Sequence, residues 1–452
     1  MIGFDYGTSN CAVAIMANNS PQILALGEHG RYIPSTLYSP SRDVIVNWLQ
    51  QHLPTNNQVA FKQQRQLQLQ KGTAALRELR LDGINSELSF GQQALNNYLE
   101  DPEEGYYIKS PKSFLGASNL MPQQIALFED IVAAMMLNIK KLTEQNLQHD
   151  ITKTVIGRPI NFQGLKGDES NRQALAILTS AAKKIGFKEI EFQYEPVAAG
   201  LEFEQCLQQE TKVLVVDIGG GTTDCSMLLM SPHYKTQLDR QAHLLAYSGQ
   251  RVGGNDFDIQ LALKGIMPSL GMNGFLKTGK PIPTNSYWQA VAINNINEQT
   301  EFYSAANARY LKELVNDAKN EHELQRLLKV QQEKLSYQLV NNAEQAKIAL
   351  TEQFEQSIDL SYLESELSTQ VDQNTLLNAS SRELNAIAAL MQSCVQQANC
   401  QPDVVFVTGG TAKSPVIAKF LQAQFPQTKL VVGDHFGSVT AGLARYAQLM
   451  FA

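Results

Sequence analysis

The chain has 452 residues, of which 43% are apolar, so it is too long for one ordinary hydrophobic core and too apolar for a disordered protein. Its 44 acidic and 37 basic residues give a net charge of −7 without a basic cluster, which argues against a nucleic-acid partner. The sequence shows no signal-peptide pattern and no membrane-spanning apolar run, and its 5 cysteines lack CxxC spacing, so we expect a cytoplasmic protein with reduced thiols.

The first third of the chain is predicted to alternate strands and helices. Apolar strands are expected at 2–6 and 11–16, so the FDYGTSN segment between them is predicted to be a hairpin, unlike phosphate loops that lead from a strand into a helix. Residues 44–100 are rich in Gln, Asn and Leu, with helical spacing in places. The other expected elements are a strand at 22–26, a helix at 121–146, a strand at 154–157 and a helix that begins at about Asp168 and ends before Gly186.

A second hairpin of the same design is predicted farther along the chain. A short strand at 192–196 first breaks into a helix at Pro196. An apolar strand then begins at Lys212, passes through Asp217 into Gly-Gly-Gly-Thr, and is followed by another apolar strand to Leu229. Because this order repeats that of residues 2–16, we infer an internal duplication.

Helices and two further strands are predicted for the part of the chain after residue 305. Residues 305–355 are polar and helical, with leucines facing a core. An apolar strand at 403–408 enters Gly409 and Gly410 and is followed by a helix. A strand at 429–432 and a helix at 438–450 complete the expected elements.

The two hairpins carry groups that suit a phosphorylated ligand with a metal ion. Backbone amides in tight glycine turns can point at an anion without steric hindrance, and the neighbouring hydroxyls add donors. Asp5 and Asp217 precede the two turns and would repel a phosphate. They can instead hold Mg²⁺ through its waters, because Mg²⁺ retains most of its hydration shell. The hairpins are therefore predicted to be two halves of a phosphate clamp.

The motifs FDYGTSN, YEPVAAGL, VDIGGGTTD, VGGNDFD and VTGGTAKSP occur along the chain. Together they resemble the ATPase domain of DnaK-type 70-kDa heat-shock chaperones, within the actin-like superfamily. The resemblance runs from residue 2 to about 450 and is loose at 44–100 and 265–335. It implies an α/β fold: a two-lobe actin-like ATPase made of duplicated ribonuclease H-like domains with inserted helical subdomains.

The resemblance also implies a set of nucleotide-binding residues, with ATP or ADP and Mg²⁺ as cofactors. The catalytic residues would be Lys112, Glu195, Asp217 and Thr222, with Lys109 as the competing lysine, and the metal would lie near Asp5 and Asp217. The phosphate loops would be Gly7, Thr8, Ser9 and Asn10, and Gly219, Gly220, Gly221 and Thr222. The adenosine would meet Glu344, Lys347, Thr351, Gly409, Gly410 and Lys413, although Glu344 and Lys347 could equally form an exposed ion pair.

The chain departs from the family pattern at three places. Ile348 and Lys413 stand where two arginines normally sandwich the adenine, which predicts weaker affinity or looser base preference. Residues 433–438 replace the family's Asn-Pro-Asp-Glu-Ala segment. No peptide-binding domain is recognised after the ATPase pattern, so we expect the chain to resemble the short YegD-type members most.

The expected domains follow the family. They are lobe I at 1–207 with an insert at about 44–100, lobe II at 211–437 with an insert at about 257–370, and a C-terminal helix at 438–452 that packs back on lobe I. We expect slow Mg²⁺-dependent ATP hydrolysis with nucleotide-driven lobe closure in a chaperone-like protein. The alternatives are a non-hydrolysing nucleotide-binding scaffold, a small-molecule kinase and an actin-like filament. Unfolded protein or a co-chaperone could bind through the surface inserts, whereas the oligomeric state is left open.

Overall fold

The computed structural model describes residues 1–27, 30–100, 102, 105–162, 164, 166–238, 240–433 and 437–452. They form two compact units. The first consists of 1–252, 387–412 and 422–452, and the second of 253–386 and 413–421. The lobe boundaries expected from the sequence stay predictions. The departure at 433–438 lies partly outside the described residues, because these omit 434–436.

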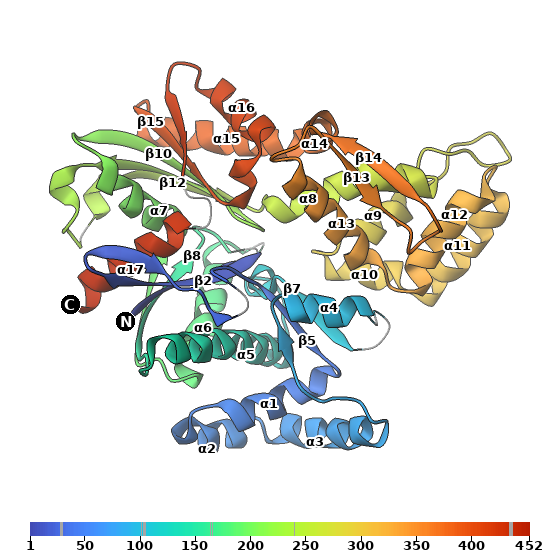
Figure 1. Cartoon of the computed structure of the whole chain (residues 1–452), viewed down its shortest axis with the longest axis horizontal. Helices are drawn as coiled ribbons and strands as arrows, with labels where there is room; N and C mark the ends of the chain where they lie inside the picture. The colour runs from blue at the N-terminus through green and yellow to red at the C-terminus, as the bar shows by residue number, and fades with distance from the viewer. Residues whose placement is uncertain are drawn as a thin grey trace. The chain divides into compact units, whose positions relative to one another are not determined.

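The first unit begins with a sheet in the order β3-β2-β1-β8-β9, with β4 paired to β2. Strands β1, β8 and β9 run parallel, whereas β1, β2 and β3 form antiparallel hairpins. Helices α5 and α6 cover one face of this sheet (Figure 1). The elements are β1 (Ile2–Tyr6), β2 (Asn10–Ala17), β3 (Ser20–Ile23), β4 (Ile33–Pro34), α5 (Pro122–Leu147), β8 (Lys153–Arg158), α6 (Asp168–Lys184) and β9 (Glu189–Tyr194).

A second sheet in the first unit repeats this topology in the order β12-β11-β10-β15-β16. Its first three strands are again antiparallel, and β10, β15 and β16 are again parallel. The repeat confirms the duplication inferred from the two hairpins, and β12 is a strand that the sequence patterns did not reveal. The elements are β10 (Thr211–Ile218), β11 (Thr223–Met230), β12 (Leu244–Gln250), β15 (Val404–Thr408) and β16 (Lys429–Val432), whereas α15 (Ser381–Ala398) and α16 (Pro415–Gln424) each contain residues of both units.

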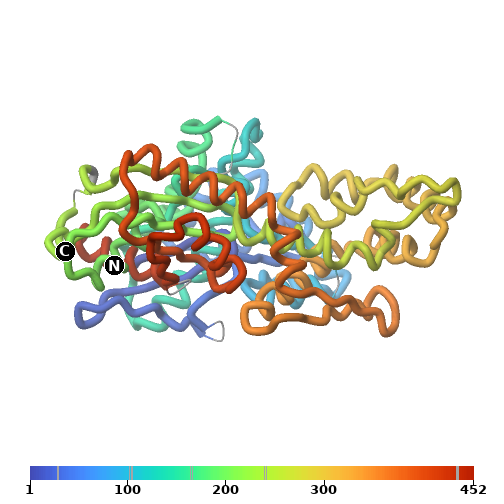
Figure 2. Tube along the Cα trace, turned by 90° about the horizontal axis from the view of Figure 1, so that it is seen from above, coloured from blue at the N-terminus to red at the C-terminus, as the bar shows by residue number. Residues whose placement is uncertain are grey.

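Helices α7 (Glu195–Phe203) and α17 (Gly437–Phe451) connect the two sheets through a shared apolar core. Val197 of α7 and Leu443 of α17 pack in one cluster with Val155 of the first sheet and Val215 of the second. The backbones of α7 and α17 approach so closely that a Cβ on Gly442 would lie 1.7 Å from the carbonyl oxygen of Ala198. The two ends of the chain consequently lie side by side in both views (Figures 1 and 2).

Between β4 and α5, the chain forms a three-stranded sheet, β6-β5-β7, and four helices. Helices α1, α2 and α3 lie against α5, on the side away from the first sheet (Figure 1). Helical spacing was therefore the informative signal in this amide-rich stretch. The elements are β5 (Thr36–Ser39), η2 (Arg42–Val44), α1 (Ile45–His52), α2 (Thr55–Gln64), α3 (Gln66–Leu81), β6 (Ser89–Phe90), α4 (Gln92–Glu100), β7 (Tyr106–Lys109) and the short 3-10 helix η3 (Pro111–Phe114).

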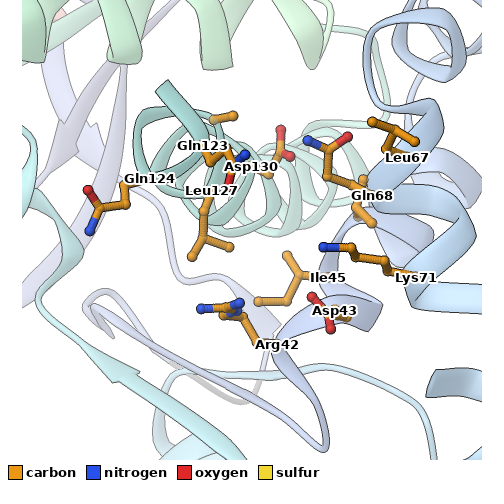
Figure 3. Close-up of a pocket in the computed structure, with 12 residues that line it drawn as sticks. Arg42, Asp43, Ile45, Leu67, Gln68, Lys71, Gln123, Gln124, Leu127 and Asp130 are labelled. Atoms are coloured by element: carbon orange, nitrogen blue, oxygen red, sulfur yellow. The ribbon is translucent and has the colours of Figure 1, made fainter. Parts of the chain in front are cut away.

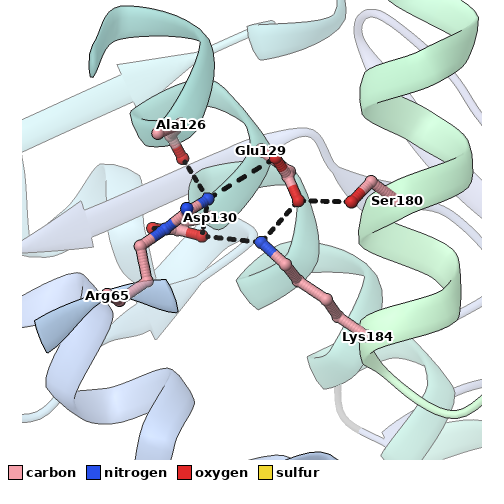
Figure 4. Close-up of polar contacts among 6 residues, drawn as sticks. All are labelled: Arg65, Ala126, Glu129, Asp130, Ser180 and Lys184. Carbon is pink, nitrogen blue, oxygen red and sulfur yellow. Dashed lines mark hydrogen bonds and ion pairs between the residues drawn. The ribbon is translucent and has the colours of Figure 1, made fainter. Parts of the chain in front are cut away.

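A buried ionic network holds these helices to α5 and α6 (Figure 4). Arg65, between α2 and α3, donates from Nε to Asp130 Oδ2 at 2.8 Å and from Nη2 to Glu129 and to the Ala126 carbonyl. Lys184 of α6 lies 2.5 Å from Glu129 and 3.3 Å from Asp130. Two cations thus face two carboxylates, and each buried charge has a partner.

We expect Arg65→Ala to lower the free energy of unfolding by about 3 kcal/mol, because it leaves buried carboxylates without one of their two cations. The loss should appear in urea denaturation at neutral pH. Lys62→Ala is the control, because Lys62 lies on the exposed surface of α2 and should change stability by less than about 0.5 kcal/mol. Equal losses in the two variants would contradict the role assigned to the network.

The second unit is mainly helical, with a two-stranded hairpin of β13 and β14 that the sequence patterns did not predict. Its core contains the leucines expected to face inward, among them Leu311, Leu327 and Leu339. No helix in the described part of the chain is both long and apolar enough to cross a membrane. The elements are α8 (Gly254–Leu261), α9 (Asn285–Val291), α10 (Ile296–Phe302), α11 (Ala305–Asp317), α12 (Glu321–Gln332), α13 (Ser336–Ala349), β13 (Glu355–Asp359), β14 (Ser368–Asp372) and α14 (Gln373–Ala379).

Candidate functional site

The two Gly-rich segments are hairpin turns, as the sequence predicts. In the first hairpin, Tyr6 pairs with Cys11 and the turn spans 7–9. In the second, Ile218 pairs with Thr223, and the Gly219 amide donates to the Thr222 carbonyl at 2.9 Å to close the turn. Both turns leave a strand and return into a strand, so neither presents the amino end of a helix.

The two turns lie against each other in the first unit. A Cβ on Gly220 would lie 1.9 Å from Ser9 Oγ and 3.0 Å from the Ser9 amide nitrogen, so this approach requires glycine. Ser35 fixes the first turn, because its amide donates to the Ser9 carbonyl at 2.8 Å and its hydroxyl to the Gly7 carbonyl at 2.7 Å. The structure therefore brings Gly7, Ser9 and Gly220 together, as the clamp requires.

Lys112 lies in η3 and is 3% exposed. Its ammonium donates to Glu195 Oε1 at 2.5 Å and to the Gly157 carbonyl at 3.3 Å. Burial alone would lower the pKa of Lys112, but the carboxylates of Glu195 and Asp5 raise it above its usual value, so the ammonium stays charged. Glu195 is held at the first turn of α7 by Pro196, as the sequence predicts.

Three further carboxyl groups share the electrostatic field of this pair. Burial, with Glu195 adding to it, raises the pKa of Asp5 to about 7 and that of Asp224 to about 8. The same two causes, with Asp224 and Asp5 adding to them, raise the pKa of Asp217 well above its ordinary value. Asp217 and Asp224 face each other across the second hairpin. The site thus concentrates four carboxyl groups around the Lys112 ammonium.

Such a surplus of buried carboxyl groups fits a divalent cation. Four carboxylates and one ammonium would leave an uncompensated negative charge in a poorly solvated place, which is why protons are retained. Among the described residues, no group of three or more His, Cys, Asp or Glu side chains is placed to ligate a metal directly. Asp5, Asp217 and Asp224 would hold such a cation through its waters, which suits Mg²⁺ because it keeps most of its hydration shell.

These pKa shifts predict a stability that depends on pH when no ligand is bound. Because the folded state retains protons on Asp5 and Asp224 that the unfolded chain releases near pH 4, stability should fall between about pH 4 and pH 8. From about pH 6 to about pH 8.5 we expect the free energy of unfolding, measured by urea denaturation, to fall by about 4 kcal/mol. Asp224→Asn keeps the acceptor for the Ile160 amide and should flatten this dependence, and an unchanged profile would contradict it.

The residues expected at the adenosine are divided between the two units. Gly409, which has φ +95°, and Gly410 belong to the first unit, whereas Glu344, Lys347, Thr351 and Lys413 belong to the second, so their assembly into one site stays a prediction. In the second unit, Lys347 lies 2.6 Å from the buried Asp258 and donates to the Gly254 carbonyl. The Thr351 hydroxyl donates to the Ile348 carbonyl.

Sequence reasoning missed three side chains at the site, namely Asp224, Thr440 and Ser35, the last of which fixes the first turn. Asp224 ends the GGGTTD motif, and its place opposite Asp217 across a four-residue turn was the signal that could have revealed it. The Thr440 hydroxyl of α17 donates to Asp5 Oδ2 at 3.4 Å from the far end of the chain. No local pattern marks Thr440, because only the packing of α17 against β1 brings it there.

Comparison with known proteins matches residues 1–263, more than half of the chain, to the family described as Hsp70 protein. The chaperone protein DnaK of Carsonella ruddii (strain PV) is 28% identical over 265 residues, which are 58% of this chain and 39% of that protein. The chaperone protein DnaK of Mycoplasmopsis agalactiae is also 28% identical over 265 residues, which are 58% of this chain and 34% of that protein. The matched region thus spans less than half of each relative.

Proposed function

The chain belongs to the Hsp70 family, and on this premise we propose that it binds ATP with Mg²⁺ and hydrolyses it slowly to ADP and phosphate. The observation that carries the proposal is the buried Lys112–Glu195 pair among Asp5, Asp217 and Asp224, beside two abutting phosphate-type turns. An ammonium and several carboxyl groups are costly to bury, so their presence in one site favours chemistry over a structural role.

The side chains can be given separate tasks in phosphoryl transfer. Backbone amides and hydroxyls of Gly7–Asn10 and Gly219–Thr222 would hold the phosphates from two sides. Lys112 would neutralise charge that develops on the transferred group, and Glu195 would keep that ammonium oriented and accept a hydrogen bond from the attacking water. Asp5 and Asp217, with Asp224, would accept hydrogen bonds from the waters of Mg²⁺, which supplies charge neutralisation between the phosphates when bound.

Single-turnover ATP hydrolysis with Mg²⁺ and without an acceptor tests this function. Release of phosphate at one equivalent per chain would support the ATPase and argue against a kinase, which requires an acceptor hydroxyl. Tight ATP binding without any phosphate release would instead favour the non-hydrolysing scaffold. That second candidate is supported by Ile348, which is 52% exposed and carries no planar cation for stacking on adenine.

We further propose that nucleotide binding closes two lobes in a chaperone-like switch, as the family relation suggests. Small-angle scattering with and without Mg²⁺-ATP checks this, because hinge closure lowers the radius of gyration. Unfolded protein and co-chaperones are the partners that kinship suggests. The relation to YegD-type members and the cytoplasmic location also stay predictions.

A further inference from the structure

A cavity of about 290 Å³ lies between α1, α3 and α5, remote in sequence from the hairpins and from Glu195 (Figure 3). Its floor and walls are apolar and come from Ile45 and Val46 of α1, Leu67 of α3, and Ala126 and Leu127 of α5. The nucleotide chemistry described above uses none of these residues. A volume of this size is at the small end for a drug-sized ligand and suits one bulky side chain of a protein partner.

The walls of this cavity are held apart by fixed contacts. At one end, Arg65 ties the start of α3 to Asp130 and Ala126 of α5. At the other, Gly72 packs so tightly on α1 that its Cβ would lie 1.9 Å from Asn47 Oδ1, and the Asn47 amide donates to Thr73 at 3.2 Å. Because α3 is anchored at both places, it cannot settle onto α5 to fill the space, and the cavity is preformed.

The rim of the cavity carries a surplus of positive charge on a chain whose net charge is −7. Arg42 and Lys71 both line it, and neither forms an ion pair or hydrogen bond with another residue in the described part of the chain. Of the two lining carboxylates, Asp130 is already bonded to Arg65 and Lys184, which leaves Asp43 against two cations. In Figure 3 the Lys71 ammonium points toward Ile45 at the floor.

The mouth of the cavity also offers groups that suit a peptide. Gln68, Gln123 and Gln124 surround it with side-chain amides, which can both donate to and accept from a peptide backbone. Leu67, at the wall, is 71% exposed, and Met121, close to Gln123 in sequence, is 66% exposed. Large apolar side chains left in water beside a pocket are typical of interaction surfaces.

We propose that this cavity, called the α1–α3–α5 pocket, binds an extended segment of a partner protein that carries a bulky apolar side chain next to carboxylates. The apolar side chain fills the space above Ile45, and the carboxylates pair with Lys71 and Arg42. Charge complementarity selects the partner, and the preformed cavity limits the ordering cost of binding. None of the residues that line the pocket belongs to the candidate nucleotide site, so we expect the peptide segment to bind without nucleotide.

The test measures fluorescence anisotropy of a labelled peptide, Ser-Gly-Asp-Leu-Phe-Asp-Gly-Ser, with the full chain in the absence of nucleotide. We expect saturable binding that weakens at least about tenfold when both Asp become Lys, or when Leu and Phe become Ser. Lys71→Glu should weaken binding of the acidic peptide about tenfold. Arg80→Glu is the matched control: Arg80 is exposed, on the same helix and nine residues from Lys71, which places it about half a turn around α3.

Methyl NMR spectra of the wild-type protein test the pocket even if Lys71→Glu disturbs folding. In the wild-type protein, peptide should shift the methyl NMR signals of Ile45 and Leu127 and leave those of Ile387, in α15, unchanged. No saturation below about 1 mM, equal binding of the acidic and basic peptides, or methyl shifts confined to other places would overturn the proposal. Because Lys112→Met should leave peptide binding intact, a failed ATPase and a failed pocket give different results.

Discussion

Lys112→Met lowers the single-turnover rate of ATP hydrolysis by about 10²–10³-fold and leaves ATP bound, if the lysine stabilises developing charge. Methionine keeps the length of the side chain but removes the ammonium that donates to Glu195 and to the Gly157 carbonyl. The phosphates are still held by the two turns, so we expect the Kd of Mg²⁺-ATP to change by less than about tenfold. Stopped-flow phosphate release and equilibrium titration measure the two quantities separately.

Lys109→Met is the control for this experiment, because Lys109 is the competing candidate and lies only three residues before Lys112. Lys109 lies at the end of β7, whose neighbour is β5, whereas Lys112 bonds directly to Glu195. We expect near wild-type hydrolysis in Lys109→Met. Loss of hydrolysis in that variant with retention in Lys112→Met would reverse the assignment. Equal loss of ATP binding and hydrolysis in Lys112→Met would indicate that the lysine mainly holds the fold together.

Much of the fold could be predicted because its signals are local. The hairpins at Gly7 and Gly220 are predictable because each glycine turn has an apolar strand on both sides. Their similar order of residues also indicates the internal duplication. The long helix α5 was also evident, because Ile131, Val132 and Met135 repeat with helical spacing. The hairpin of β13 and β14 could not be predicted, because its strands are mostly polar and lack an apolar alternation. Only Ile358 and Val371 are buried in it.

Residues of the candidate site could be predicted from the sequence only where they belong to a recognisable motif. Asp5, Asp217 and Glu195 sit within motifs, and the structure places them in one electrostatic field. Thr440 reaches the site through the packing of α17, and Ser35 through the pairing of β4 with β2, and both depend on contacts between residues that are distant in sequence. The α1–α3–α5 pocket could not be predicted from the sequence either, because the contact of Arg65 with α5 and that of Gly72 with α1 form only in the folded chain.

Gly220→Ala weakens Mg²⁺-ATP binding by about 10²-fold, because it forces apart the two turns that hold the phosphates. The new Cβ would lie 1.9 Å from Ser9 Oγ, and rotation of the hydroxyl does not remove the contacts at 2.9 Å with Ser9 Cβ and 3.0 Å with its amide. The loss of one or two hydrogen bonds to a charged phosphate is enough for an effect of this size. Isothermal titration calorimetry with a non-hydrolysable ATP analogue measures it without interference from turnover.

Two variants separate this steric cause from a general effect of alanine in the turn. Gly219→Ala adds the same methyl group to the neighbouring residue, but its nearest contact is 3.2 Å from the Thr222 carbonyl oxygen, so we expect less than tenfold weakening. Ser9→Gly in the Gly220→Ala background removes the obstructing side chain and should restore part of the affinity, although the amide contact at 3.0 Å remains. If Gly219→Ala and Gly220→Ala weaken binding equally and Ser9→Gly restores nothing, the abutting turns do not form a clamp. Nucleotide would then have to be held by other parts of the chain.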